Sequence, residues 1–358
     1  MIKVLVVEDS AVARELLIGI LAADPGIEVI GTATDGKEAI EFVNRDRPDV
    51  VTMDIYMPTI SGIEATQRIM ETNPVPIVVV SGNWNPEEAE TTFRLMEAGA
   101  VAIVQRPTGP GHPDHSRMVR EFLQTVKAMS EVKVVRRWPH NRKTASVSSA
   151  QLANIQTAVL PSSVDNLRAI AIGASIGGPI ALRTILNSLP ADFPVPLLIV
   201  QHMTTGFIEA MVAWLGETSR IPLHIAKNYE QPIPGHAYFA PDGRQMGLYG
   251  SGRISIIEGK AENGAKPSVS YLFRSVAGVF DKKAAGVLLT GMGNDGADAL
   301  KLMKDKGAIT IAQDSESSVV YGMPGVAAEI GAATYILSPE RIATALISIV
   351  NKERSERK

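Results

Sequence analysis

Three carboxylates that could bind a cation follow two short apolar segments near the start of the chain. Glu8 and Asp9 come directly after residues 2–7, and Asp54 follows residues 50–53. Both segments are rich in Val and predict buried parallel strands, and the ligands of such sheets gather beyond the carboxyl ends of the strands. Like charges held this close need a cation, and oxygen ligands with room for water suit Mg²⁺. The pattern therefore predicts a magnesium site.

A hydroxyl and a guanidinium group end two further predicted strands. Ser81 follows residues 77–80, and Arg106 comes shortly after residues 101–104. A carboxylate, a metal ion and a cation around one point are the parts needed to form an aspartyl phosphate, and the hydroxyl can donate to a phosphoryl oxygen. One acidic residue alone could simply end a strand or cap a helix. The whole set at matched strand ends favours a phosphoacceptor site.

A second group of reactive residues lies in the other half of the chain, beginning with a serine in a glycine-rich turn. Residues 169–172 predict a strand that runs into Gly173-Ala174-Ser175-Ile176-Gly177-Gly178-Pro179 and then a helix. Small residues let the backbone bend sharply and expose the Ser175 hydroxyl, while the helix N-terminus supplies N–H groups. Such a turn could equally bind a phosphate, so on its own it leaves nucleotide binding open.

Two partners for this serine end further predicted strands. His202 follows residues 196–200, and Asp295 lies in a glycine-rich segment after residues 286–290. Taken singly, the histidine could be a packing or surface residue, and the second segment could be a phosphate loop or a helix cap. Together they predict a nucleophile, a general base and an orienting carboxylate. Their order along the chain, Ser-His-Asp, differs from that of the α/β-hydrolases, but a triad is defined by its geometry.

The elements that must position both groups alternate as strand and helix throughout. This alternation predicts an α/β protein with a flavodoxin-like five-stranded parallel sheet, followed by a second, doubly wound and mostly parallel sheet with one hairpin near residues 237–257. We expect a first domain over residues 1–130, a basic linker rich in Ser and Thr over 131–165, and a second domain over 166–350.

Charge and composition narrow the class of protein. The 358 residues carry a net charge of −3, yet residues 1–107 alone carry −9, which argues against nucleic acid as a ligand of the first domain and suits a bound cation. The chain has no Cys, which removes disulfides and thiolate chemistry. No apolar run approaches the roughly 20 residues of a membrane span. These features predict a soluble cytoplasmic protein with no membrane insertion.

Residues 1–107 resemble a response-regulator receiver domain. The resemblance implies that Glu8, Asp9 and Asp54 hold Mg²⁺, that Asp54 is the phosphoacceptor, and that Ser81 and Arg106 are switch residues. The family usually has Lys where this chain has Arg106, and the two cations differ in reach and geometry. A histidine kinase would be the phosphodonor.

Residues 167–350 resemble the catalytic domain of the chemotaxis protein-glutamate methylesterases (the CheB family). The resemblance rests on residues 173–179, 201–203, 290–297, 312–317 and 320–324. It implies that Ser175 is the nucleophile, His202 the base and Asp295 the orienting carboxylate, with backbone amides near Ile176 and Met292 holding the oxyanion. The family commonly has Thr where this chain has Ile176.

The combined resemblance implies a phosphorylation-regulated serine hydrolase. It would demethylate glutamate γ-methyl esters on chemoreceptors, release methanol, and deamidate receptor glutamines, with no cofactor for ester hydrolysis. Three alternatives stay open at this point. They are a signalling protein whose second half only binds, a nucleotide-binding enzyme, and an esterase that acts on small molecules.

Overall fold

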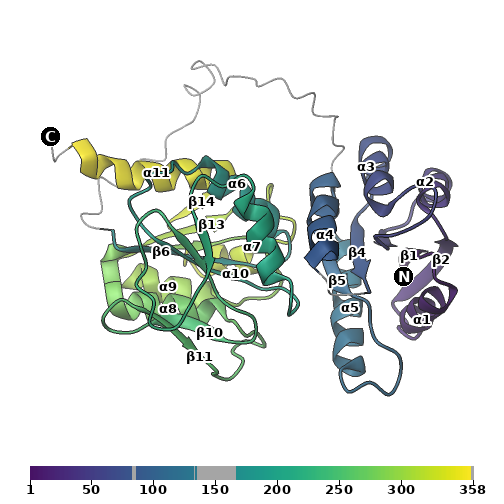
Figure 1. The fold of residues 1–358 in the computed structure, drawn as a ribbon, viewed down its shortest axis with the longest axis horizontal. Helices are drawn as coiled ribbons and strands as arrows, with labels where there is room; N and C mark the ends of the chain where they lie inside the picture. Colours follow the sequence, from purple (N-terminus) through teal and green to yellow (C-terminus); the bar gives the residue numbers. More distant parts are fainter. Residues whose placement is uncertain (83–85, 133, 135–166, 356–358) are drawn as a thin grey trace, which may run out of the picture.

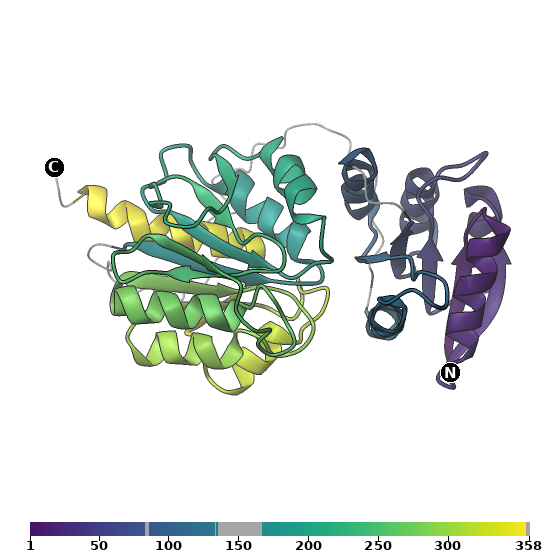
Figure 2. The same cartoon turned by 60° about the horizontal axis from the view of Figure 1, so that its bottom comes forward.

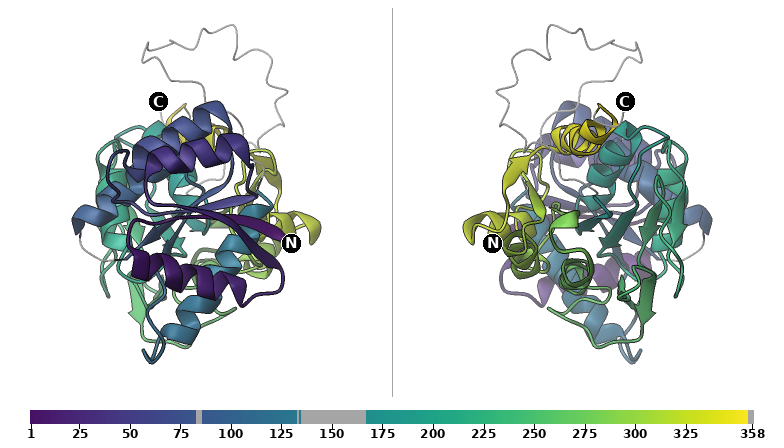
Figure 3. Two further views of the ribbon diagram at one scale, coloured as in Figure 1. Left: turned by 90° about the vertical axis from the view of Figure 1, so that its right-hand side faces the viewer. Right: turned by 90° about the vertical axis from the view of Figure 1, so that its left-hand side faces the viewer.

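The computed structural model describes residues 1–82, 86–132, 134 and 167–355, and the linker predicted over residues 131–165 falls almost entirely outside them. Two sheets of parallel strands, each flanked by helices, make up most of the structure (Figure 1). We call the first sheet with its helices the N-terminal domain and the second the C-terminal domain. The two domains lie one behind the other when viewed along the long axis (Figure 3).

The N-terminal domain is a five-stranded parallel sheet in the order β2-β1-β3-β4-β5. Its strands are β1 (Ile2–Val7), β2 (Ile27–Ala33), β3 (Val50–Met53), β4 (Ile77–Ser81) and β5 (Ala102–Gln105). Its helices are α1 (Ala11–Ala22), α2 (Gly36–Arg45), α3 (Gly62–Thr72), α4 (Pro86–Ala98) and α5 (His115–Ser130). The order reverses between β1 and β3, which leaves a crevice for a ligand beyond their carboxyl ends.

Both faces of this sheet are buried, which explains why its strands are almost continuously apolar. In β1, Val4 and Val6 belong to one buried cluster, while Leu5 and Val7 belong to the cluster on the opposite face. Alternate side chains of a strand point to opposite faces, so a strand covered on both sides needs apolar residues at every position. The carboxylates of Glu8, Asp9 and Asp54 come only after the last residue of their strand.

The C-terminal domain contains a seven-stranded sheet in the order β14-β13-β12-β6-β7-β9-β8. Its strands are β6 (Ala169–Ala174), β7 (Leu197–Gln201), β8 (Leu223–Ile225), β9 (Ala237–Phe239), β12 (Ala284–Leu288), β13 (Ile309–Gln313) and β14 (Tyr335–Leu337). Every pairing in it is parallel. The predicted fold class is therefore confirmed, and the order again reverses between β12 and β6.

Helices cover both faces of the second sheet (Figures 1 and 2). On one face lie α6 (Gly178–Ser188), α7 (Ile208–Gly216) and α11 (Pro339–Ser355), and on the other lie α8 (Val269–Phe280), α9 (Ala297–Asp305) and α10 (Met323–Glu329). A short 3₁₀ turn, Asp281–Lys283, joins α8 to β12. No helix within the described ranges combines the length and the apolarity that crossing a bilayer requires.

A hairpin lies within the stretch predicted for it, over residues 245–257. Residues 237–239 join the parallel sheet as β9, and the hairpin pairs β10 (Gln245–Leu248) with β11 (Ile254–Ile257). Gly247 lies inside β10, although glycine has a low strand propensity. The structure gives a reason for that glycine: a Cβ atom there would lie only 2.7 Å from the Ser275 hydroxyl of α8. Close packing of a helix on the hairpin thus overrides the low strand propensity of glycine.

The two domains meet where α4 packs against α7 (Figure 1). The Phe93 ring of α4 stacks on Trp214 at a centroid distance of 5.1 Å and meets Phe207 edge-on at 6.4 Å. Glu97 of α4 accepts a hydrogen bond of 3.2 Å from the Trp214 indole and forms an ion pair with Arg183. Phe93 is fully buried, so part of the apolar core of the C-terminal domain is completed by a residue from the N-terminal domain.

Candidate active site and phosphoacceptor site

Ser175, His202 and Asp295 lie beyond the carboxyl ends of three neighbouring strands. Ser175 directly follows β6, His202 directly follows β7, and Asp295 lies in the loop after β12. The sheet runs β12-β6-β7 at this place, so the serine is on the middle strand of the three. The strand order reverses between β12 and β6, and this is where an open parallel sheet binds its ligands. The three residues predicted from the sequence are thus brought together.

Ser175 sits in a tightly held turn. Its backbone N–H donates to the Thr290 carbonyl at 3.0 Å, and its own carbonyl accepts from the Gly178 N–H at 2.8 Å, where α6 begins. Gly177, between them, has a φ of +78° that favours glycine. A Cβ atom on Gly291 would come within 2.6 Å of the Ser175 Cβ, so the backbone at position 291 can lie this close to the serine only with a glycine.

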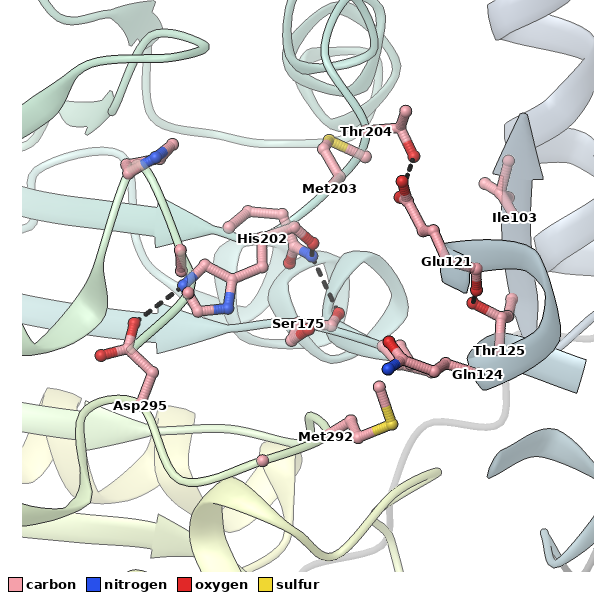
Figure 4. Close-up of a pocket in the computed structure, with 18 of the residues that line it drawn as sticks. Ile103, Glu121, Gln124, Thr125, Ser175, His202, Met203, Thr204, Met292 and Asp295 are labelled. Carbon is pink, nitrogen blue, oxygen red and sulfur yellow. Dashed lines mark hydrogen bonds and ion pairs between the residues drawn. The ribbon is translucent and has the colours of Figure 1, made fainter. Parts of the chain in front are cut away.

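The imidazole of His202 lies between the other two side chains (Figure 4). Its Nε2 is 3.0 Å from Asp295 Oδ2, and the other ring nitrogen is on the side of Ser175. The Nε2–H is not well aligned with the carboxylate oxygen, although the distance is that of a hydrogen bond. Catalytic hydrogen bonds are often poorly aligned before a substrate binds.

Asp295 is a buried carboxylate anchored at the start of α8. It accepts hydrogen bonds from the backbone N–H groups of Val269 at 2.7 Å and Ser270 at 3.1 Å, and from the Ser268 hydroxyl at 3.0 Å and the Asn263 amide at 3.1 Å. Helix N-termini stabilise anions.

The ionisation of Asp295 follows from these contacts. Burial by itself raises the pKa of Asp295, but His202, Ser270 and Asn263 outweigh it and hold that pKa well below the ordinary range of an aspartate. The side chain is therefore a fixed anion that can orient an imidazole ring and stabilise its protonated form.

Two backbone N–H groups border the same pocket as Ser175. Among the described residues, no acceptor is paired with the N–H of Ile176 or with that of Met292. Gly293, next to Met292, has a φ of +85°, a conformation that favours glycine and bends the loop at this point. Unpaired N–H groups beside a nucleophile are the usual material of an oxyanion hole.

The pocket itself is built from both domains. It has a volume of about 650 Å³, and its walls include Ser175, His202 and Asp295 together with residues of β5 and α5. Figure 4 shows Ile103, Glu121, Gln124 and Thr125 of the N-terminal domain opposite Ser175 and Thr204. Glu121 accepts a hydrogen bond of 3.2 Å from the Thr204 hydroxyl. The N-terminal domain therefore forms one wall of the space in front of the serine.

The predicted acidic cluster forms at the carboxyl ends of β1 and β3. Each of Glu8, Asp9 and Asp54 offers an oxygen within 4.8 Å of those of the other two. Burial and the neighbouring charge of Glu8 raise the pKa of Asp54 to about 7. Burial also raises the pKa of Glu8, although Arg106 opposes that rise. Carboxylates crowded in this way fit a divalent cation, which would relieve their mutual repulsion.

The two predicted switch residues also lie at this edge of the sheet. Ser81 ends β4 and is buried. Arg106 follows β5, and its Nη1 lies 3.2 Å from Glu8 Oε2. A Cβ atom on Gly82 would lie 2.1 Å from the guanidinium, so the glycine gives Arg106 the room to reach Glu8. The Arg106 guanidinium is thus held within the acidic cluster, where its positive charge also lowers the pKa of Asp54.

Some residues that hold the site were not predicted as functional. Asn263, Ser268 and Ser270 bind Asp295, and the Gln201 side chain binds the backbone of Ser175. Ser268 carries a recognisable signal as a helix N-cap, but nothing in the sequence indicates that the cap faces a carboxylate from a distant loop. Such contacts between distant segments appear only in the folded chain.

Comparisons with known proteins agree with this architecture. Residues 4–134 match the response regulator receiver domain, and residues 170–346 match the CheB methylesterase domain. A protein-glutamate methylesterase/protein-glutamine glutaminase of Geobacter metallireducens is 57% identical over 98% of this chain and 99% of its own. One of Nitrosospira multiformis is 55% identical over 100% and 99%.

A solved structure gives the same result for the second half. The CheB methylesterase catalytic domain of Thermotoga maritima is 35% identical, with a TM-score of 0.50, and the match covers 51% of this chain and 98% of that one. The fold, the two-domain order and the near full-length identity lead to one conclusion. The chain belongs to the family of protein-glutamate methylesterases/protein-glutamine glutaminases, with a receiver domain ahead of a CheB methylesterase domain.

Proposed function

We propose that this protein hydrolyses glutamate γ-methyl esters on chemoreceptors and releases methanol, using Ser175, His202 and Asp295. The observation that carries the proposal is the placement of these side chains at adjacent strand ends, with the imidazole between the hydroxyl and an anchored carboxylate. Relatives that match nearly the whole chain bear the name of this activity. The same site would hydrolyse glutamine side chains and release ammonia.

The first half of the reaction is acyl transfer to the serine. Ser175 Oγ attacks the ester carbonyl carbon while the His202 nitrogen on the serine side accepts the hydroxyl proton. The carbonyl oxygen becomes an oxyanion, which the N–H groups of Ile176 and Met292 would stabilise. Asp295, an anion at Nε2, stabilises the imidazolium that forms. The imidazolium then protonates the methoxide oxygen, methanol leaves, and a glutamyl ester of Ser175 remains.

The second half returns the enzyme to its starting state. A water molecule gives a proton to His202 and attacks the glutamyl carbonyl carbon. The second tetrahedral intermediate uses the same N–H groups. Its collapse breaks the bond to Ser175 Oγ, which recovers its proton from His202, and releases glutamate. With a glutamine side chain the leaving group is ammonia, and the remaining steps are unchanged.

Methanol release from receptor-containing membranes tests this proposal directly. Receptors carrying tritiated methyl esters on glutamate should lose volatile label when the full-length protein is added with acetyl phosphate and Mg²⁺. A non-catalytic signalling protein would release none. An esterase for small molecules would hydrolyse a soluble ester yet leave the receptor label in place.

Asp54 is the residue we propose for phosphorylation by a histidine kinase. Glu8, Asp9 and Asp54 would hold Mg²⁺, which when bound supplies charge neutralisation for phosphoryl transfer. Asp54→Asn should reduce incorporation of labelled phosphate from acetyl phosphate to background, because the accepting carboxylate is gone. It should leave the domain folded, since one of three crowded negative charges is removed. A labelled Asp54→Asn protein would show that another residue accepts the phosphoryl group.

Phosphorylation would act through the wall that the N-terminal domain places in front of Ser175. Phosphoryl-Asp54 can favour an open arrangement only if it stabilises that arrangement more than the closed one. The contacts that must be broken include the ring stack of Phe93 on Trp214, the polar contacts of Glu97 and Glu121, and apolar packing of the C-terminal domain on the N-terminal core. An interface within one chain is usually modest in area, which allows it to open.

Weakening this interface should raise activity without phosphorylation. Phe93→Leu removes a stacked aromatic pair, worth about 0.5–1.5 kcal/mol beyond area burial, so basal methanol release should rise severalfold, up to about tenfold. The matched control is Phe122→Leu, the same change at an equally buried ring inside the N-terminal core. Equal basal rates for Phe93→Leu and wild type would mean that the α4 contact does not restrain the enzyme.

A further inference from the structure

The side chain of Gln201 joins the two segments that carry the nucleophile and the base. Gln201 is the last residue of β7 and is 3% exposed. Its amide nitrogen donates to the Ser175 carbonyl at 2.8 Å and to the His202 carbonyl at 2.7 Å. Both acceptors are carbonyl oxygens, which can only accept, so the NH₂ end of the amide must face them. One hydrogen of the NH₂ group therefore binds the segment that carries the nucleophile, and the other binds the segment that carries the base.

This contact begins where the hydrogen-bonded ladder of the sheet stops. The register between β6 and β7 ends at the pair Ala174 and Gln201, and the His202 N–H still reaches the Ala174 carbonyl at 2.8 Å. Ser175 and His202 form the next pair along, and both have left the strand conformation. The Gln201 amide ties their carbonyl groups together in place of the missing backbone ladder.

The surroundings of the amide are shaped to keep it there. A Cβ atom on Gly178 would lie 2.2 Å from Gln201 Oε1, so only glycine at the start of α6 leaves room for this side chain. No described residue donates a hydrogen bond to Oε1, which is buried. Leaving a buried amide oxygen without a donor costs free energy. Burying the Gln201 amide therefore costs free energy at Oε1. The favourable contacts of the amide are its two donated hydrogen bonds.

We propose that Gln201 is a positioning residue that sets the approach of the Ser175 hydroxyl to the His202 ring; this inference rests on the proposed esterase function. Its NH₂ group binds the two backbone carbonyl groups and not the Ser175 hydroxyl or the His202 ring, so it would act through the backbone. A misplacement of about 1 Å between reacting groups can lower a rate by about 10²-fold. Loss of the tie should therefore lower kcat and leave KM nearly unchanged.

Two substitutions at Gln201 separate positioning from general packing. Gln201→Met keeps the length of the side chain but has no donor, and we expect kcat for methanol release to fall by about 10- to 100-fold. Gln201→Glu can donate only as the neutral acid, and burial against carbonyl oxygens raises the pKa of a carboxyl group. Its rate relative to wild type should therefore rise as the pH falls, whereas the ratio for Gln201→Met should be flat.

A buried glutamine at the end of another strand serves as the control. Gln313 ends β13 and binds the backbone of Thr290 and Ser317 without contacting Ser175 or His202. Gln313→Met should lower the melting temperature by a similar amount but change kcat by less than about threefold, because Ser175 keeps both its backbone bond to the Thr290 carbonyl and its tie to His202 through Gln201. The rate at which a fluorophosphonate labels Ser175 should fall for Gln201→Met in step with kcat, since this probe needs no receptor contact.

Each outcome decides the inference. A wild-type kcat in Gln201→Met, or an equal loss of kcat in Gln313→Met, would overturn it. A rate of Gln201→Glu relative to wild type that did not change with pH would also overturn the positioning role. This measurement tests the role even if Gln201→Met does not fold. Wild-type protein that neither releases methanol nor reacts with fluorophosphonate at Ser175 would instead refute the proposed function, and the positioning role with it.

Discussion

Replacing Ser175 with Ala is expected to lower methanol release from methylated receptors by roughly 10⁴- to 10⁶-fold, because no hydroxyl remains to form the acyl-enzyme. The oxyanion N–H groups and the pocket would survive, and they account for the small activity that should persist. The rate should be measured on the phosphorylated protein, in which we expect the N-terminal wall of the pocket to move away from Ser175.

The structural cost of this substitution should be small. Ser175 has only 9% of its surface exposed, but its turn is held by backbone hydrogen bonds to Thr290 and Gly178, which an alanine keeps. The melting temperature of Ser175→Ala should therefore stay close to that of the wild type. Near-normal turnover in a folded Ser175→Ala protein would rule out this serine as the nucleophile.

Replacing Asp295 with Asn should lower turnover by about 10⁴-fold, the loss seen when an orienting carboxylate is changed to an amide. The physical reason is specific to this site. One carboxylate oxygen faces the Val269 N–H and His202 Nε2, and the other accepts from Ser268, Ser270 and Asn263. In the asparagine variant, the NH₂ group would replace one of these two oxygens and face hydrogen-bond donors in either position. If it replaced the oxygen beside His202, Nε2 would have to accept a hydrogen bond from it, which places the ring proton on the nitrogen that should accept the Ser175 proton.

A control for Asp295→Asn removes one of the supporting donors and keeps the anion. Ser268→Ala loses a single hydroxyl bond to Asp295 and the N-cap of α8, which costs about 1 kcal/mol of stability. Because the other donors and the charge remain, turnover should fall by less than about tenfold. If Asp295→Asn lowered turnover no more than Ser268→Ala does, the carboxylate would have no orienting role.

The location of both sites could be predicted from the sequence because strand ends are easy to find in a parallel α/β protein. Buried strands rich in Val and Ile stop abruptly at polar residues, as β1 does at Glu8 and β7 at His202. Parallel strands place these ends at one edge of a sheet. The rule predicts that Ser175, His202 and Asp295 lie at one edge of a sheet, the resemblance to the methylesterases assigns them to one triad, and the structure brings them together.

Other features depend on contacts that no local pattern encodes. Nothing in Phe93 or Trp214 distinguishes a residue that joins two domains from one inside a single core. Asp295 itself lies two residues before α9, which begins at Ala297. Gly296, with a φ of +90°, separates the carboxylate from the helix and frees it to meet α8.

The two departures from family pattern can be placed in physical terms. Arg106 reaches Glu8, so the positive charge expected of a Lys is kept within the acidic cluster. Ile176 belongs to the turn after Ser175, and its carbonyl accepts a 2.9 Å hydrogen bond from the Thr290 hydroxyl. The backbone of this turn is thus held through its carbonyl group, independently of the side chain at position 176.

The most direct test of the account is to map where a fluorophosphonate binds covalently to the full-length protein. We expect one adduct per chain, located on Ser175 by peptide mass spectrometry, with methanol release lost in proportion to labelling. His202→Ala and Asp295→Asn should label far more slowly, because the hydroxyl is no longer activated. Labelling at another serine, or full methanol release by a protein completely modified at Ser175, would contradict the central claim.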